Sequence, residues 1–509
     1  MARRARPIGG VALAAGALVA AAVLAPLAAV LARAQALPGA ADWAALRFTL
    51  MQAALSAAIS ISLAVPVARA LARRRFPGQA AVIALLGAPF ILPVVVAVMG
   101  LIAIFGRAGP VSDALAALGM ARLSIYGLPG ILLANVFFNL PLAVRLVLQG
   151  WRDIPAERFR LAAALGFGPR EVARHLERPM LGAVLPGTAL AVFLICLSSF
   201  AIALTLGGGP RATTVELAIY QAFRFDFDPG RAAVLAAVQL GIGILAAGLA
   251  LALATPPGFG AGLDRAPRRW DVPRGPVAVL DAGWIAVALA FLVLPLAALA
   301  LEGATGIAGL PAPVWQAAAR SLAMALASAA LATGLAVALA RARFSEGVAM
   351  LPIAASPLVL GTGLFLLIRP LADPVALALP VTVAVNALTA LPFAVRALAP
   401  PLREAEATQG RLADSLGLTG WTRLRHAILP RIGAPLGFAF GLSAALAMGD
   451  LGVIALFADP ERATLPLQVF RLMAAYRSQD AAAAAVLLMG LSFALFALFD
   501  RWGRRHAAT

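Results

Sequence analysis

The sequence contains no lysine, and all 41 of its basic residues are arginine. The phosphate loop of ATP-hydrolysing proteins needs a lysine that reaches the β- and γ-phosphates of the nucleotide. This chain therefore cannot contain a working loop of that kind. If ATP drives its activity, another subunit must hydrolyse the nucleotide.

Cysteine and histidine are almost absent. The chain has one cysteine, Cys196, inside an apolar run, and three histidines, His175, His426 and His506. One cysteine cannot form a disulfide within the chain, and it cannot build a cysteine-based metal site. Because the histidines are far apart in the sequence, we expect neither a metal site nor a cofactor.

Charged residues are also scarce. They make up 13% of the chain, whereas hydrophobic residues make up 62%, and the mean hydropathy is +0.93. Soluble domains average about 45–50% apolar and about 25% charged residues. The composition therefore predicts an integral membrane protein whose main surroundings are the lipid bilayer.

The formal net charge of +18 is of a size often found in nucleic-acid-binding proteins. Here, however, the arginines stand in short clusters between apolar runs, where the positive-inside rule of membrane topology accounts for them. We therefore expect no nucleic-acid partner.

About twelve apolar runs approach the ~20 residues that a membrane-spanning helix needs. The predicted fold is an all-α polytopic membrane protein. The first run follows arginines and resembles a signal peptide, but its 25 residues exceed the usual ~7–15 of a signal core, so we favour an uncleaved helix. The expected spans are 8–32, 48–72, 80–105, 130–150, 182–206, 231–254, 277–300, 316–340, 348–368, 378–399, 435–457 and 481–500.

Arginine placement predicts the topology, because positive charge accumulates on the cytoplasmic side. With both termini in the cytoplasm, the inside segments hold 26 of the 41 arginines. Those segments are 1–7, 73–79, 151–181, 255–276, 341–347, 400–434 and 501–509.

The chain repeats itself. NVFFNLPLAVR (135–145) aligns with NALTALPFAVR (386–396) at an offset of 251, and 16 of the 45 positions from 135 to 179 are identical to their counterparts. Each half contains an even number of expected spans, so the two halves are predicted to be parallel repeats. We expect a first repeat of six helices (1–254), a cytoplasmic linker (255–276) and a second repeat of six helices (277–509).

One cytoplasmic segment recurs in both halves. RLAAALGFGPREVARHLERPMLG (160–182) lies almost entirely in the inside segment 151–181, and RLADSLGLTGWTRLRHAILPRIG (411–433) lies within 400–434. In each copy a short helix is expected to end at a glycine with a left-handed cap, and a second amphipathic helix is expected to end at a proline. We call the two segments the first and second elbows. A lipid-binding amphipathic helix is the alternative, but it does not explain the shared spacing, so we favour partner docking.

The elbows resemble the EAA loop of bacterial ABC importer permeases. In that family the loop docks on a cytoplasmic ATPase subunit, which implies two ATPase copies here and a coupling role for the matching residues. The leading glutamate of the family motif is replaced by Arg160 and Arg411. The other matching positions are Ala162, Gly166, Leu176 and Pro179 in the first elbow, and Ala413, Gly417, Ala427 and Pro430 in the second.

Segments on the predicted outer face, such as LGGGPRATTVELAIYQAFRFDFDPGRAA (206–233), resemble the fused thiamine/thiamine pyrophosphate ABC transporter permeases. The resemblance runs essentially from end to end. It implies a permease of the bacterial inner membrane, supplied by a periplasmic thiamine-type binding protein and catalysing no reaction itself. Related fused permeases move ferric iron through the same architecture, so iron is the alternative substrate.

Two other classes of protein fit the sequence less well. An intramembrane enzyme would need several polar groups at one membrane depth, and the expected spans offer almost none beside one aspartate. A secondary transporter could also contain two repeats, but it would not need two docking elbows.

That aspartate is Asp450, in LAMGDLGVIALF. A carboxylate in a spanning helix costs about 2.5–3.5 kcal/mol on insertion scales and usually faces a cavity or a partner. One hypothesis is that Asp450 attracts a cationic substrate along the pathway. The alternatives are an ion pair with Arg145 or Arg396, and a position nearer the outer interface.

Three asparagines lie in the expected fourth and tenth helices. Asn135, Asn139 and Asn386 could contact substrate or form hydrogen bonds between helices, and we favour the second role. Prolines in the expected spans can kink helices, although proline is common in membrane helices in general.

Overall fold

The computed structural model describes residues 8–207, 209–253, 269–272, 275–340, 345–457 and 460–506. The predicted N-terminal segment 1–7 and most of the predicted linker, 255–268 and 273–274, lie outside this part. The described residues form helices joined by turns, without a strand among them.

The first-half helices are α1 (Ile8–Arg33), α2 (Ala40–Arg73), α3 (Gln79–Leu85), η1 (Ala88–Phe90), α4 (Val94–Phe105), α5 (Pro110–Ala117), α6 (Leu128–Arg152), α7 (Ala156–Ala164), α8 (Pro169–Val172), η2 (Ala173–Glu177), α9 (Arg178–Leu197), α10 (Phe200–Leu206), η3 (Pro210–Ala212), α11 (Val215–Arg224) and α12 (Pro229–Leu253). The second-half helices are α13 (Pro276–Gly303), η4 (Ala304–Gly309), α14 (Ala312–Leu339), α15 (Ser345–Met350), η5 (Leu351–Ala354), α16 (Pro357–Ile368), α17 (Ala378–Ser415), α18 (Gly420–Arg423), η6 (Leu424–Ile428), α19 (Gly433–Met448), α20 (Gly452–Phe457), η7 (Pro460–Arg462), α21 (Leu465–Ala474) and α22 (Ser478–His506).

The predicted all-α membrane fold is confirmed, because 11 helical segments in the described part are long and apolar enough to cross a bilayer. The expected span 348–368 is not among them. Only the 12 residues of α16 form an α-helix in its C-terminal part, since Pro352 lies in the 3₁₀ turn η5 before it and Pro357 can only begin a helix there. The expectation of one continuous helix there was wrong.

The matching span 80–105 is broken in the same way. Gly87, Pro89 and Pro93 fall between α3 and α4, where a short 3₁₀ turn, η1, replaces the helix. A proline removes a backbone donor and disfavours helical geometry in the residue before it, so two prolines four residues apart end the helix. The expectation of a continuous helix was wrong here also.

Two further spans break near their C-terminal ends. Helix α9 stops at Leu197 and α10 starts at Phe200, while α19 stops at Met448 and α20 starts at Gly452. Ser199 and Asp450 lie in the two breaks and are separated by the repeat offset of 251. Both halves therefore interrupt a membrane helix at the same place.

Corresponding helices of the two halves pack in corresponding ways. Helices α2, α6 and α9 contact one another in the first half, as α14, α17 and α19 do in the second. One hydrogen bond occurs at matching places in both halves. The Val215 N–H donates to Thr49 Oγ1 over 2.9 Å, and the Leu465 N–H donates to Ser321 Oγ over 2.8 Å. These matches support two repeats, whose boundaries stay a prediction.

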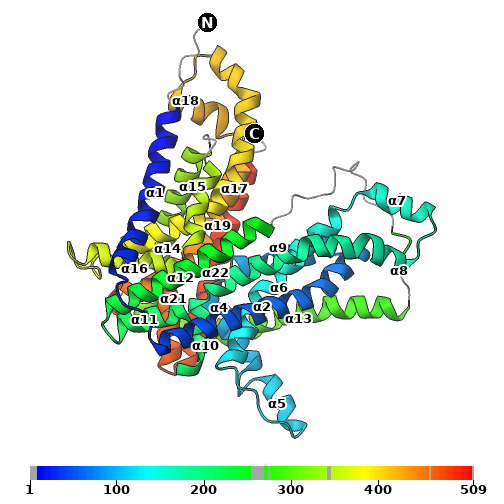
Figure 1. Ribbon diagram of the computed structural model, residues 1–509, viewed down its shortest axis with the longest axis horizontal. Coiled ribbons are helices and arrows are strands. Elements are labelled where there is room, and N and C mark those ends of the chain that lie inside the picture. The colour runs from blue at the N-terminus through cyan, green and yellow to red at the C-terminus, as the bar shows by residue number, and fades with distance from the viewer. Residues whose placement is uncertain are drawn as a thin grey trace.

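The first helix of each half packs against the other half. Helix α1 lies on α16, and α13 lies on α4 and along α2 (Figure 1). Both crossings place a glycine on a proline. A Cβ added to Gly100 would lie 2.6 Å from the Pro295 carbonyl oxygen, and one added to Gly363 would overlap the backbone of Pro26. The glycines therefore permit the close approach that joins the halves.

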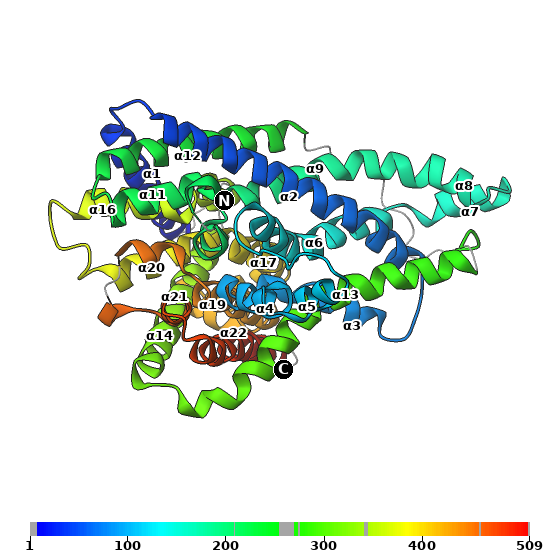
Figure 2. The same cartoon turned by 90° about the horizontal axis from the view of Figure 1, so that it is seen from below.

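The two elbows lie at separate ends of the molecule. Helices α7 and α8 close one lobe, which contains α2, α6, α9 and α13, while α18 closes the other lobe (Figure 1). Viewed at right angles, α7 and α8 again lie at one extremity (Figure 2). The elbows are thus two separate surfaces.

The sequence predicted that the second elbow begins with a separate short helix, but the structure does not contain one. Helix α17 runs without a break to Ser415, whereas α6 ends at Arg152 and α7 starts after Pro155. Glu406 takes the position of Pro155 in the second copy. Glutamate favours a helix interior and proline does not, so only the first copy breaks.

We expect Gly100→Ala and Gly363→Ala to destabilise the protein by about 1–3 kcal/mol each, because overpacking a tight contact forces helices apart. Gly334→Ala is the matched control, since Gly334 lies within α14 and an added Cβ meets nothing within 4 Å. Thermal unfolding in detergent measures the effect. Equal unfolding midpoints for all three variants would show that the two crossings are loose.

Candidate functional site

A cavity of about 380 Å³ lies between the two halves. The turn before α4, the middle of α6 and α17, and the two helix breaks all contribute to its wall. The four residues that the sequence singled out inside the membrane are all part of this wall: Asn135, Asn139, Asn386 and Asp450. The tertiary structure thus brings together side chains that are up to 315 positions apart in the sequence.

Each helix break at the cavity is capped by a carboxylate. Asp450 Oδ1 accepts the N–H of Gly452 over 3.2 Å at the start of α20. Glu216 Oε2, reaching from α11, accepts the N–H of Phe200 over 3.0 Å at the start of α10. The first N–H groups of a helix lack internal partners and carry partial positive charge, so a carboxylate suits both places.

Glu216 was missed by the sequence reasoning. It is 1% exposed, and burial raises its pKa to about 7, although hydrogen bonds to the carboxylate oppose the shift. The available signal was a lone carboxylate in the apolar stretch VELAI. The sequence does not show that α11 folds back and places Glu216 against the start of α10.

Three buried polar atoms on the cavity wall make no hydrogen bond of good geometry among the described residues, although the Asn386 amide lies close enough to interact with the Asp450 carboxylate. They are Asp450 Oδ2, Asn386 Nδ2 and Ser199 Oγ. Neither Arg145 nor Arg396 forms an ion pair with Asp450 in this part of the chain, so the structure does not show the ion-pair alternative. Buried polar groups are usually paired, and unpaired ones clustered at a cavity mark a place for a polar ligand.

Asn135 and Asn139 hold helices together. Asn135 Nδ2 donates to Gln52 Oε1 over 2.8 Å and to Ser56 Oγ over 3.1 Å. Asn139 Nδ2 donates to the Asn135 carbonyl oxygen, and Gln52 Nε2 donates to the Cys196 carbonyl oxygen over 2.7 Å. These bonds join α2, α6 and α9, which is the interhelical role that we favoured. Gln52 was missed, although a glutamine inside an apolar run was a visible signal.

Asn386 differs from its counterpart Asn135 because the neighbouring helix differs. Thr49 and Ser321 accept matching hydrogen bonds in the two halves and are 272 positions apart. At this offset, Gln52 corresponds to Met324. Methionine offers no amide oxygen, so Asn386 lacks the acceptor that Asn135 has, and its amide lies beside the Asp450 carboxylate instead. The second half therefore presents an amide and a carboxylate together at the cavity where the first half does not.

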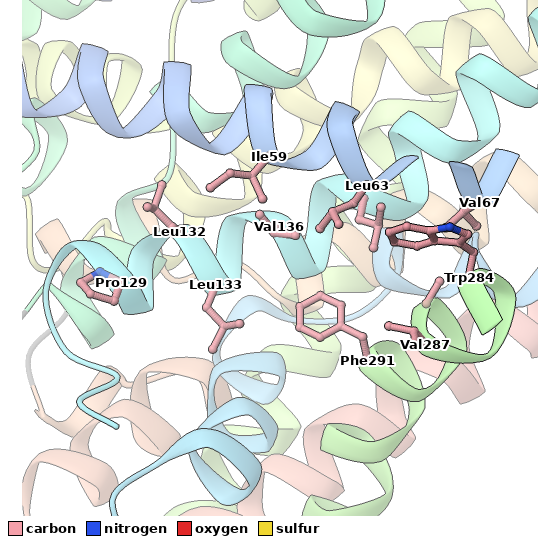
Figure 3. Close-up of a pocket in the computed structure, with 12 residues that line it drawn as sticks. Ile59, Leu63, Val67, Pro129, Leu132, Leu133, Val136, Trp284, Val287 and Phe291 are labelled. Carbon is pink, nitrogen blue, oxygen red and sulfur yellow. The ribbon is translucent and has the colours of Figure 1, made fainter. Parts of the chain in front are cut away.

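A second cavity, of about 350 Å³, lies among α2, α6 and α13. Figure 3 shows its wall of aliphatic and aromatic side chains, with Phe291 and Trp284 on α13 facing Leu63 and Val67 on α2. Since this wall carries no charged group, it does not suit a charged solute. The cavity at Asp450 therefore stays the candidate for one.

The elbow glycines have the left-handed backbone that the sequence predicted. Their φ angles are +70° for Gly166 and +67° for Gly417. Ala162 and Ala413 are buried inside the elbows, while Arg160 and Arg411 are exposed. Leu176 and Ala427 are half-buried, and Pro179 and Pro430 are exposed.

Pro179 does not end a helix, which corrects the expectation for the first elbow. It lies in the first turn of α9, directly after the π-helical turn η2, and the chain stays helical from α8 through α9. A proline within a helix removes one backbone hydrogen bond, and here the regular ladder is already replaced by the wider π-helical turn just before Pro179. In the second elbow Pro430 does lie in a turn, between η6 and α19.

Each elbow exposes leucines that the sequence reasoning did not select. Leu161 and Leu165 are 61% and 62% exposed, and their counterparts Leu412 and Leu416 are 56% and 64% exposed. An apolar patch of this kind, repeated on two predicted cytoplasmic surfaces, is typical of a protein-binding site.

No protein-family model matches the chain. Among characterised proteins, the thiamine transport system permease protein ThiP of Brucella abortus (strain 2308) is 40% identical over 475 residues, covering 90% of this chain and 87% of that protein. ThiP of Salmonella typhimurium (strain LT2) is 39% identical over 490 residues, covering 92% and 90%. ThiP of Haemophilus influenzae (strain Rd) is 32% identical over 473 residues, covering 89% and 88%.

We expect Gln52→Met, which copies the second half, to lower stability by about 1–3 kcal/mol, because it removes the acceptor of Asn135 and leaves buried polar groups unpaired. The reverse change, Met324→Gln, gives Asn386 a partner and should not destabilise the protein. Thermal unfolding of both variants in detergent provides the comparison. Equal losses of stability would contradict the asymmetry between the halves.

Proposed function

Because the chain belongs to the family of thiamine transport system permeases, we propose that it forms the membrane pathway of an ABC importer for thiamine. The observation that carries the proposal is the cavity between the halves, with a buried, unpartnered carboxylate oxygen of Asp450 on its wall. Thiamine has a fixed positive charge on its thiazolium ring. A carboxylate attracts a cation far more strongly in surroundings of low dielectric constant than in water.

In this proposal Asp450 Oδ2 faces the thiazolium, while Asn386 and Ser199 offer hydrogen-bonding groups to the rest of the molecule. The helix breaks let these groups reach the pathway, as in transporters that bind substrate at discontinuous helices. Ferric iron is a poorer fit, since among the described residues no group of three or more metal-binding side chains could hold an ion.

ATP hydrolysis is assigned to separate subunits, since the chain lacks the lysine of a phosphate loop. One cytoplasmic ATPase subunit docks on each elbow, with the exposed leucines in its groove, and a periplasmic binding protein delivers thiamine to the outer face. Closure of the ATPase pair moves the elbows and switches the cavity between outward and inward openings. No covalent bond of the substrate changes.

The topology follows from the arginines, with the elbows and both termini in the cytoplasm and the chain in the bacterial inner membrane. The repeats span 1–254 and 277–509, joined by the cytoplasmic linker 255–276. A secondary transporter would work without an ATPase, so co-purification of an ATPase subunit and ATP-dependent uptake separate the two mechanisms.

Asp450→Asn should reduce ATP-dependent thiamine uptake into proteoliposomes by about tenfold or more, which corresponds to the loss of about 1.4 kcal/mol of charge attraction. The asparagine oxygen can still accept the Gly452 N–H, so the helix cap is kept. Asp373→Asn is the control, because Asp373 is exposed and bonds only the Val375 N–H among the described residues. Wild-type uptake by Asp450→Asn would remove Asp450 from the pathway.

Valine at both Gly166 and Gly417 should uncouple ATP hydrolysis from uptake, because each glycine has a left-handed backbone that a β-branched residue adopts with strain. Gly119→Val is the matched control. Gly119 has a φ of +74° and open space around it, like the elbow glycines, but it follows α5 far from both elbows. The ratio of thiamine taken up to ATP hydrolysed is the measurement. Normal coupling in the double variant would reject the assigned role of the glycines.

A further inference from the structure

The second elbow contains a buried arginine. Arg423 is 5% exposed, and its guanidinium pairs with Asp414 and, over 2.9 Å, with Glu406 Oε1. It also lies directly over Gly410, where an added Cβ would come within 2.8 Å of Nη2. This one side chain therefore joins the end of α17 to α18 across the elbow.

The first elbow has no such residue of its own. At the repeat offset of 251, Arg423 corresponds to Val172, while its partners Glu406 and Asp414 correspond to Pro155 and Ala163. Gly410 corresponds to Phe159. Neither the arginine nor its two carboxylates are present, so the first elbow needs another way to fix its two helices.

An arginine from the linker occupies the equivalent place. The guanidinium carbon of Arg269 lies 4.6 Å from the centre of the Phe159 ring. Its Nη2 is 3.1 Å from Glu177 Oε1, and Asp271 binds the same guanidinium at two atoms, over 2.6 and 2.7 Å. The Arg269 side chain is 10% exposed and that of Asp271 is fully buried.

The neighbouring linker residue adds a contact to the elbow turn. Trp270 Nε1 donates to the Phe167 carbonyl oxygen over 3.1 Å, directly beside Gly166. Burial alone would lower the pKa of Arg269, but Asp271 and Glu177 raise it overall. The guanidinium thus stays charged in a site that is built around it.

The same site is tied to the transmembrane helices. Glu177 also pairs with Arg69 over 2.7 Å and with Arg73 over 3.2 Å, both at the cytoplasmic end of α2. Arg74 pairs with Asp281 on α13 over 2.7 Å. Glu177 and Arg269 therefore join the linker, the first elbow and the end of α2 through buried or half-buried ion pairs, and the adjacent Arg74–Asp281 pair joins the end of α2 to the start of α13.

We propose that Arg269 is a positioning residue of the first elbow, supplying from the linker the arginine that the second elbow carries as Arg423. This inference rests on the proposed role of the elbows in ATPase docking. The linker is then part of the coupling apparatus, because it holds α7 and η2 in a fixed relation to α2. Movement imposed by the ATPase passes to α2 and α13 and is not lost in local bending of the elbow.

Arg269→Ala is the test, in proteoliposomes that contain the complete chain, the ATPase and the binding protein. We expect the thiamine taken up per ATP hydrolysed to fall about fivefold or more, while basal ATP hydrolysis continues and its stimulation by the binding protein is lost. Arg269→Lys keeps the charge beside Glu177 and should recover part of the lost coupling. Arg122→Ala is the control, because it removes an arginine from an exposed ion pair with Asp113. Wild-type coupling in Arg269→Ala overturns the proposal.

Failure of the proposal for Arg269 can be distinguished from failure of the proposed transport function. If the wild-type chain stimulates the ATPase without taking up thiamine, the assigned substrate is wrong. The effect of Arg269→Ala on ATPase stimulation by the binding protein still tests the positioning role in that case. A variant that stimulates the ATPase as the wild-type chain does would then contradict it.

Discussion

In a lipid bilayer, a backbone N–H or C=O group without a hydrogen-bond partner costs several kcal/mol, so a spanning helix can break only where something else satisfies its ends. This constraint accounts for the two capped helix breaks at the centre of the molecule. Both halves break a helix at the same repeat position, and a carboxylate caps the helix that follows, Asp450 in one half and Glu216 in the other. The breaks in turn create the cavity, because a continuous helix would present only its own hydrogen-bonded surface there.

The two carboxylates both cap a helix start, but they come from different elements, so the polar groups left at the cavity differ between the halves. Glu216 reaches α10 from a separate helix, whereas Asp450 belongs to the break itself and keeps one oxygen unpartnered on the cavity wall. Asn386 has no glutamine beside it, because Met324 stands where the first half has Gln52, and its amide lies beside Asp450 instead. The second half therefore supplies most of the polar groups that are not bonded to neighbouring helices at the cavity, whereas those of the first half are bonded to neighbouring helices.

The elbows show the same relation between repetition and divergence. Pro155 breaks the first copy into two helices, while Glu406 lets α17 continue in the second. Arg423 holds the second elbow together from within, and Arg269 reaches the first from the linker. The proposed docking role needs the same mechanical result at both elbows, and different residues give it in the two halves.

The amino-acid sequence by itself determined the membrane class, the approximate places of most of the spanning helices, the internal repeat and the left-handed glycines of the elbows. These depend on composition and on local backbone preferences, which neighbouring residues in the chain decide. The same local rules predict that the prolines break two of the expected spans. These breaks were missed because each apolar run is about as long as the ~20 residues of a spanning helix. Only the tertiary structure decided which polar groups meet. The crossing of Gly100 with Pro295, the cap that Glu216 gives to α10 and the approach of Arg269 to Phe159 each join residues far apart in the chain. Such contacts depend on how apolar helices pack, and a helix that is apolar on nearly every side does not specify its neighbours.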